Sequence, residues 1–127
     1  MTEMRFLFMI VIILEHIFNY SMSTLFIPGT WQVLDEQTAA YLAELFRSLS
    51  DPSRVRIISA LSSGEKSVSV LADALGLTIS AVSHHLRGLR QMRLVRARKD
   101  GRQVYYTLDD EHIEDLYRRG LDHALHR

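Results

Sequence analysis

The chain has 127 residues, of which 47% are hydrophobic and 24% charged, a composition typical of a single globular domain. It contains no cysteine, which excludes a disulfide framework, a thiolate metal site and thiol redox sensing. The formal net charge is zero, yet residues 87–102 hold seven basic residues against one acid and carry +6. A local basic stripe of this kind is typical of nucleic-acid binding, with a solvated surface as the alternative.

The first 33 residues are expected to form an N-terminal extension. Residues 6–14 are an apolar run that is too short for a transmembrane helix, which needs about 20 residues. The run follows Arg5 and is similar to a signal-peptide core, but no small-residue cleavage site comes after it. We therefore expect Met22 to be the natural start and residues 1–21 not to be native, with a membrane-associating tail as the alternative. Residues 22–33 are predicted to be an irregular arm.

Two helices are predicted at the start of the domain, which we place at residues 34–127. Asp35 can cap a helix that runs to about residue 49, because the apolar side chains that follow it have helical spacing. Asp51 followed by Pro52 combines a helix cap with proline at the first helical position. The second helix therefore begins there, and it ends at the Ser-Ser-Gly sequence of residues 62–64.

The next segment predicts a helix-turn-helix followed by a wing. Residues 67–75 form a short helix closed by Gly76, and Thr78 caps a longer helix from residue 79 to about residue 92. Strands at 95–99 and 103–108 flank the Asp-Gly pair of residues 100–101, a strong signal for a hairpin. A last helix, capped by Asp109 or Asp110, runs to the C-terminus. The predicted fold is mainly α with a small β-hairpin.

Three histidines and one aspartate near the C-terminus have a spacing that suits metal binding. His123 and His126 are three residues apart, so on a helix they share a face. His112 lies eleven residues before His123, about 16 Å away along a helix, so one helix cannot close a site around one ion. Two antiparallel copies can do so, with Asp110 and His112 of one chain meeting His123 and His126 of the other. This donor set suits Zn(II), or Co(II) in its place.

Several segments of the domain resemble the ArsR/SmtB family of winged-helix metal-sensing repressors. The matching pieces are residues 45–57, residues 80–86, Leu94-Val95 and residues 101–108, and the resemblance covers roughly residues 34–127. It implies a cytoplasmic homodimer, joined through its N- and C-terminal helices, that binds double-stranded operator DNA and releases it when metal binds. It implies neither an enzyme nor a small-molecule substrate, and we expect no membrane partner.

The resemblance also indicates which kind of metal site to expect. One variety of the family carries cysteines in the third helix, where this chain has Ser67 and Ser69, and serine is a poor ligand for soft ions. The other variety carries Asp-x-His and His-x-x-His or Glu on the last helix, which Asp110, His112, His123 and His126 match. The resemblance therefore implies a zinc sensor, with solvated surface residues as the alternative.

The DNA-binding and dimer residues are predicted from helical faces. Val82, Leu86 and Leu89 should face the core, so the outer face of that helix and the wing should contact DNA. We expect His85 to be structural. The predicted DNA-binding residues are Thr78, Ser80, Ser83, His84, Arg87, Arg98, Lys99, Arg102 and Gln103. An apolar stripe on the last helix predicts a dimer seam, with packing on the protomer's own core as the alternative. The stripe contains Ile113, Leu116, Tyr117, Gly120, Leu121 and Ala124.

The sequence thus predicts a metal-responsive transcriptional repressor. A family member that responds to nickel or cobalt, or to a non-metal signal, is the first alternative; nickel usually prefers more ligands and octahedral geometry. A metal-dependent hydrolase is the second, but it needs an open coordination position, and four protein ligands fill a tetrahedral site.

Overall fold

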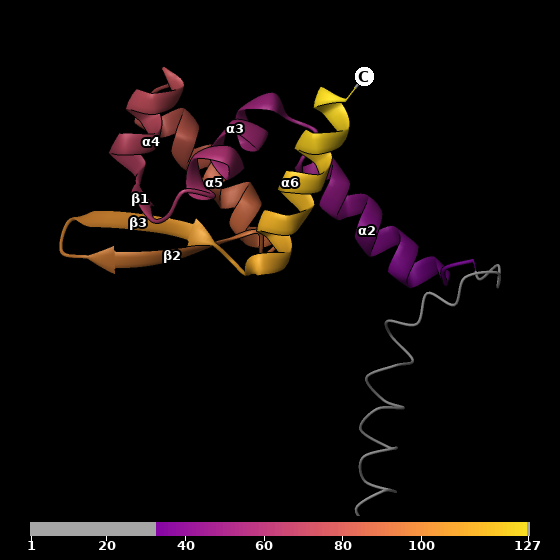
Figure 1. The fold of residues 1–127 in the computed structure, drawn as a ribbon. Helices are drawn as coiled ribbons and strands as arrows, with labels where there is room; N and C mark the ends of the chain where they lie inside the picture. Colours follow the sequence, from indigo (N-terminus) through magenta and orange to yellow (C-terminus); the bar gives the residue numbers. More distant parts are fainter. Residues whose placement is uncertain (1–32, 127) are drawn as a thin grey trace, which may run out of the picture. The chain divides into compact units, whose positions relative to one another are not determined.

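The computed structural model describes residues 33–126, and Asp35–Arg127 forms one compact unit. The predictions for residues 1–32 lie outside the described part of the chain. Within residues 33–126 no helix is long and apolar enough to cross a bilayer. The elements, shown in Figure 1, are α2 (Glu36–Ser48), α3 (Pro52–Leu61), β1 (Lys66–Ser67), α4 (Val68–Leu75), α5 (Ile79–Gln91), β2 (Val95–Asp100), β3 (Gln103–Leu108) and α6 (Glu111–Leu125).

The helices begin and end at the residues whose side chains satisfy their free backbone groups. Asp35 accepts a hydrogen bond from the Thr38 amide at 2.9 Å, and the Thr38 hydroxyl and amide hold the pKa of this carboxyl below its ordinary value. Thr78 accepts from the amide of Ala81 at 3.1 Å and caps α5. Gly76 ends α4 with a φ of +68°, a left-handed conformation that favours glycine. The predicted helix boundaries are confirmed to within a residue or two.

The wing is part of a three-stranded antiparallel sheet in the order β1-β3-β2. The predicted hairpin of β2 and β3 is present, and Gly101 at its turn has a φ of +59°. The structure adds β1, in which Lys66 pairs with Tyr106 and Ser67 pairs with Tyr105. The middle of β3 is therefore paired with the residues that lead into α4.

The core lies between α3, α4, α5 and the start of β2. Val82, Leu86 and Leu89 are fully buried, as their spacing predicts. Leu71 from α4 and Ile57 from α3 are buried with them, and Tyr106 packs against this cluster. These contacts hold α4 and α5 together as the helix-turn-helix, with the sheet following it. The winged helix-turn-helix prediction is confirmed.

A partly buried arginine joins three helices at the junction of α2 and α3. Nη1 of Arg54 donates to the backbone oxygen of Ser48 at 3.2 Å and lies 3.3 Å from the Ser48 hydroxyl. The guanidinium also lies against Gly88 of α5, where an added Cβ would be 2.5 Å from Nη2. His85, also on α5, places Nδ1 3.9 Å from Oδ1 of Asp51, the cap of α3. The glycine permits this close approach.

Helix α2 leaves much of its apolar side-chain surface uncovered. Tyr41 and Phe46 are more than half exposed, and Ser48 is the one residue of this helix that is buried. Leu45 and Leu49 pack against the core at the C-terminal end of the helix, and Figure 1 shows the rest of α2 extending away from α3, α4 and α5. The exposed apolar surface of α2 therefore has no cover within Asp35–Arg127.

Candidate functional site

The four predicted metal ligands lie at the two ends of α6. Asp110 is the N-cap of this helix, and His126 is its C-cap. At a rise of about 1.5 Å per residue, the thirteen residues from Asp110 to His123 span about 20 Å. Among residues 33–126, no three histidine, aspartate or glutamate side chains lie close enough to hold one ion together. The candidate ligands therefore form two separate pairs, and the four-ligand site stays a prediction.

At the first end, the Asp110 carboxylate already supports the helix. Its Oδ1 accepts hydrogen bonds from the amides of His112 at 2.9 Å and Ile113 at 3.3 Å. Nδ1 of His112 lies 3.4 Å from the same oxygen, and the His112 side chain is 83% exposed. The imidazole and the carboxylate are thus close together and open to solvent, in a pair that could hold part of a metal's coordination shell.

At the second end, the two histidines lie on the last turn. Nδ1 of His126 is 2.7 Å from the backbone oxygen of Asp122 and 3.2 Å from its Oδ1. When an imidazole donates through Nδ1 to a carbonyl, the lone pair on Nε2 is free to bind a metal ion. This is the usual arrangement for a metal-binding histidine. His123 is exposed on the same turn. Both side chains can therefore meet a group from outside the chain.

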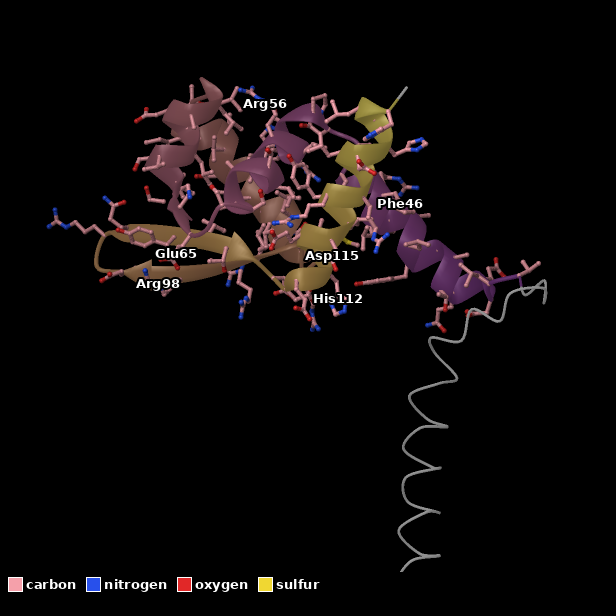
Figure 2. The ribbon with its side chains drawn as sticks, viewed as in Figure 1. Phe46, Arg56, Glu65, Arg98, His112 and Asp115 are labelled. Atoms are coloured by element: carbon pink, nitrogen blue, oxygen red, sulfur yellow. The ribbon has the colours of Figure 1, made fainter. Side chains whose placement is uncertain are left out.

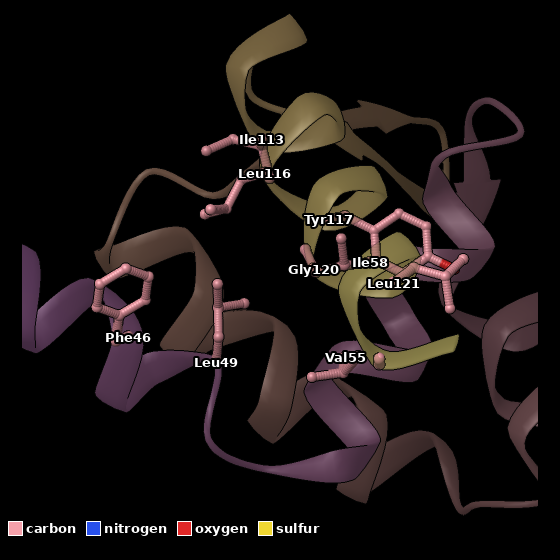
Figure 3. Close-up of a pocket in the computed structure, with 10 residues that line it drawn as sticks. Phe46, Leu49, Val55, Ile58, Ile113, Leu116, Tyr117, Gly120 and Leu121 are labelled. Atoms are coloured by element: carbon pink, nitrogen blue, oxygen red, sulfur yellow. The ribbon is translucent and has the colours of Figure 1, made fainter. Parts of the chain in front are cut away.

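An apolar groove of about 330 Å³ runs along α6 between the two ends (Figure 3). All six predicted dimer residues line it, together with Phe46 and Leu49 from the end of α2 and Val55 and Ile58 from α3. Ile113 and Tyr117 also pack against the protomer's own core, and the Tyr117 hydroxyl donates to Oγ of Ser59 at 2.8 Å. Leu121, Gly120 and Ala124 are exposed. The stripe thus has one covered edge and one open edge.

The outer face of α5 presents polar and basic side chains. Ser80, His84 and Arg87 are exposed and Ser83 is half-buried, on the side away from the buried Val82, Leu86 and Leu89. Their hydroxyl, imidazole and guanidinium groups suit phosphates and base edges. Helix α5 therefore has the core face and the outer face that its sequence predicts. Its contacts with DNA stay a prediction.

In the wing, the structure separates Arg98 from the other basic residues. Its guanidinium makes two hydrogen bonds to the Glu65 carboxylate, at 2.6 and 3.1 Å (Figure 2). It also lies 4.8 Å from the centre of the Tyr105 ring. The bonds from Arg98 lower the pKa of Glu65, and the carboxylate raises that of Arg98. Lys99 and Arg102 are exposed, so they are free to reach phosphates. The predicted contact of Arg98 with DNA would have to compete with Glu65.

Two features of the site have no counterpart in the predicted set. Glu65 lies 33 residues before Arg98, and the pairing of β1 and of β2 with β3 brings the two segments together. Ile79, the first residue of α5, is 57% exposed, although isoleucine is usually buried. Its spacing of three from Val82 and seven from Leu86 places Ile79 on their side of the helix, so the sequence pattern favours a buried position, and only the structure shows it exposed. Ser67, at a position of the cysteine variety, caps α4 by accepting from the Val70 amide.

Comparison with known proteins places these features in a family. Residues 51–97 match the model of the bacterial regulatory protein, arsR family. A transcriptional repressor SmtB homolog from Synechocystis is 49% identical over 92 residues, which cover 72% of this chain and 70% of that protein. The transcriptional regulator NmtR of Mycobacterium tuberculosis is 41% identical over 93 residues, 73% of this chain and 78% of that one.

A solved structure shows the same architecture. The homodimeric winged helix-turn-helix DNA-binding domain from Mycobacterium bovis superposes with a TM-score of 0.65 at 27% identity, over 75% of this chain and 90% of that one. That domain is a winged helix-turn-helix, the architecture that α4, α5, β2 and β3 form here.

Proposed function

The chain belongs to the arsR family of bacterial regulatory proteins, and from this premise we propose that it is a zinc-responsive repressor whose metal-free homodimer binds operator DNA. The family and the relatives are transcriptional regulators rather than enzymes, in agreement with the sequence prediction. One observation carries the zinc-specific part of the proposal: two incomplete ligand pairs lie at opposite ends of one exposed helix. A regulator of this kind acts in the cytoplasm.

The homodimer is supported by the apolar surface that one chain leaves open. Exposed side chains of α2, such as Tyr41 and Phe46, and the groove along α6 belong to the first and last described helices of the unit. Gly120 and Ala124 are small and exposed, so a second helix can approach α6 closely there. An antiparallel pair of α6 helices would bring each Asp110 end beside a His123 end. The symmetry of a dimer then creates two identical sites.

The donors fit a tetrahedral zinc site. Asp110 and His112 of one copy and His123 and His126 of the other would supply one carboxylate and three imidazoles, a set that Zn(II) accepts. Oδ1 of Asp110 is engaged by the helix amides, which leaves Oδ2 for the ion. The chain has no thiolate for a soft ion, and Ser67 serves as a helix cap instead.

The DNA-binding part of the proposal rests on α5 and the wing. The two recognition helices of a dimer would enter successive major grooves of a palindromic operator, with Ser80, Ser83, His84 and Arg87 toward the bases and phosphates. Thr78, Lys99, Arg102 and Gln103 would contact the flanking backbone or minor groove. Arg98 contributes there to the extent that DNA displaces Glu65 from its guanidinium.

Metal and DNA are coupled through α6. This helix packs on α3, which in turn packs on α4 and α5, and Tyr117 ties α6 to Ser59 of α3. Ligands drawn from both chains fix the relative rotation of the two α6 helices, and hence the separation of the two recognition helices. By linkage, metal must weaken DNA binding by the same factor by which DNA weakens metal binding.

The first test measures metal binding without DNA. Competition with a chromophoric chelator should give two zinc ions per dimer for the wild type, and none of comparable affinity for His123→Ala or His112→Ala. Glu111→Ala is the matched control, because Glu111 is an exposed acid next to Asp110 but outside the ligand set. Equal zinc affinity in the wild type and His123→Ala would refute the site.

The second test measures DNA binding on the protein's own upstream region at fixed salt. Fluorescence anisotropy should show tight metal-free binding, release by excess zinc and recovery with a chelator, and His123→Ala should bind DNA but ignore zinc. The cobalt form separates the alternative, a member of the family that senses nickel. Intense visible absorption indicates four-coordinate cobalt and supports the zinc-type site, whereas weak bands indicate six ligands. Metal-independent DNA binding would point to a non-metal signal.

A further inference from the structure

The recognition helix begins with an exposed apolar side chain. Ile79 is the first residue of α5, directly after the cap Thr78, and is 57% exposed. By helical spacing Ile79 lies on the side of Val82 and Leu86, which are fully buried, but its place at the very start of the helix leaves it outside the core. Leaving an isoleucine in water costs hydrophobic free energy that burial would recover. A partner that covers this side chain would therefore gain affinity.

The surroundings of Ile79 indicate what kind of partner fits. Ile79 lines a shallow hollow of about 370 Å³ between the helix-turn-helix and the wing. Ser83 lies one turn further along α5 and lines the same hollow, and Arg102 and Gln103 approach it from β3 and the turn before it. The other lining residues are Ser69, which like Ser83, Arg102 and Gln103 can donate hydrogen bonds, and the apolar Val68 and Val104. The hollow thus combines polar and cationic donors with an apolar surface, of which Ile79 is the exposed part.

DNA offers one apolar group in the major groove that matches this arrangement. In the major groove, a protein can recognise thymine by apolar contact with its C5-methyl group. Recognition helices contact base edges there with their N-terminal residues. We propose that Ile79 is a specificity-determining residue that packs against a thymine methyl in each half of the operator. The inference rests on the proposed function, since it assumes that α5 enters the major groove.

The expected size of the effect follows from the burial of one methyl group. Such a contact corresponds to about a four-fold change in affinity per half-site, and therefore roughly fifteen-fold when a symmetric dimer loses it at both half-sites. The effect depends on the methyl group alone. Deoxyuridine lacks that methyl but keeps every hydrogen-bonding group of thymine, so it provides a direct probe.

The experiment uses full-length, metal-free protein and the duplex that binds it most tightly from a randomised pool. Each symmetric pair of thymines is replaced in turn by deoxyuridine, and affinity is measured by fluorescence anisotropy at fixed salt. For the wild type, replacing one particular pair of thymines should weaken DNA binding roughly fifteen-fold. Ile79→Ala should bind the thymine duplex about that much more weakly and show no further loss at the same pair. Val70→Ala is the matched control, because Val70 is 50% exposed on α4 but does not line the hollow.

The outcomes separate this inference from the proposed function. If the wild type and Ile79→Ala lose the same affinity at every deoxyuridine pair, Ile79 does not contact a thymine methyl and the inference is wrong, while DNA binding stands. If Val70→Ala also abolishes the deoxyuridine effect, the contact is not specific to Ile79 and the inference is again wrong. If the metal-free protein enriches no duplex from the pool, both the inference and the repressor function fail.

Discussion

Replacing Gly88 by alanine tests the polar junction between α2, α3 and α5. In an ordinary helix interior this change stabilises by about 1 kcal/mol, because glycine is a poor helix former. Here the new Cβ would lie 2.5 Å from Nη2 and 2.8 Å from Cζ of Arg54, far inside the roughly 3.5–4.0 Å of a normal contact. The guanidinium must then retreat by about 1 Å. Because these atoms end a flexible side chain, the shift itself is cheap, and we expect its cost to be the loss of the bonds to Ser48, already 3.2 and 3.3 Å long.

The lost bonds outweigh the gain in helix propensity. Hydrogen bonds to a charged group contribute about 1.5–3 kcal/mol each, and two long ones together roughly 2–3 kcal/mol. Gly88→Ala should therefore lower the free energy of unfolding by about 1–2 kcal/mol. In an Arg54→Ala background the obstacle is absent, and the same substitution should instead stabilise by about 1 kcal/mol. Gly88→Ala is thus predicted to destabilise the protein when residue 54 is arginine and to stabilise it when residue 54 is alanine.

Urea denaturation followed by circular dichroism measures all four proteins of this double-mutant cycle. Protein concentration must be held constant, because the unfolding midpoint of a dimer depends on it. A coupling of about 2–3 kcal/mol between the two positions is expected. If Gly88→Ala stabilises the wild type as much as it stabilises Arg54→Ala, the guanidinium does not pack against α5 and the reasoning is refuted.

Three further substitutions test other contacts. Tyr117→Phe removes the bond to Ser59 and should cost about 1 kcal/mol in urea unfolding, but nothing in a Ser59→Ala background; equal costs in the two backgrounds would contradict the bond. Arg93 has a φ of +54°, so Arg93→Gly should stabilise by roughly 0.5–1 kcal/mol relative to Arg93→Ala, and no difference would contradict the strain. The lowered pKa of Glu65 means that its pair with Arg98 stabilises fully above the ordinary value of 4.5 and weakens as pH falls through the lowered value. The difference in Tm between the wild type and Glu65→Gln should therefore shrink from pH 7 to pH 3, and a constant difference would argue against the pair.

The helix boundaries could be predicted because capping is local chemistry. Asp51 lies within three residues of the amides it binds, and Gly76 supplies a left-handed conformation that other residues resist. The spacing of Asp110 and His112 from His123 likewise depends only on the rise of a helix. The separation of the ligands into two pairs therefore follows from the sequence, although the complete site needs a second chain.

Contacts between distant segments could not be predicted in the same way. β1 has two residues and pairs with a strand about forty positions later, so no periodic pattern marks it. The contact of Arg98 with Glu65 depends on that pairing, and without it Arg98 resembles every other arginine of the basic stripe. The approach of Arg54 to Gly88 depends on how α3 packs on α5. Each of these requires the tertiary structure.

The position of the two ligand pairs at opposite ends of α6 has a genetic consequence. In the proposed dimer, a chain that lacks His112 spoils one half of each site, and so does a chain that lacks His123. Each inactive variant alone therefore forms only damaged sites. A mixed dimer of the two variants pairs the intact first end of one chain with the intact second end of the other, and the two defects meet in the remaining site. Two non-responsive alleles expressed together should thus restore one working sensor per mixed dimer, which is intragenic complementation.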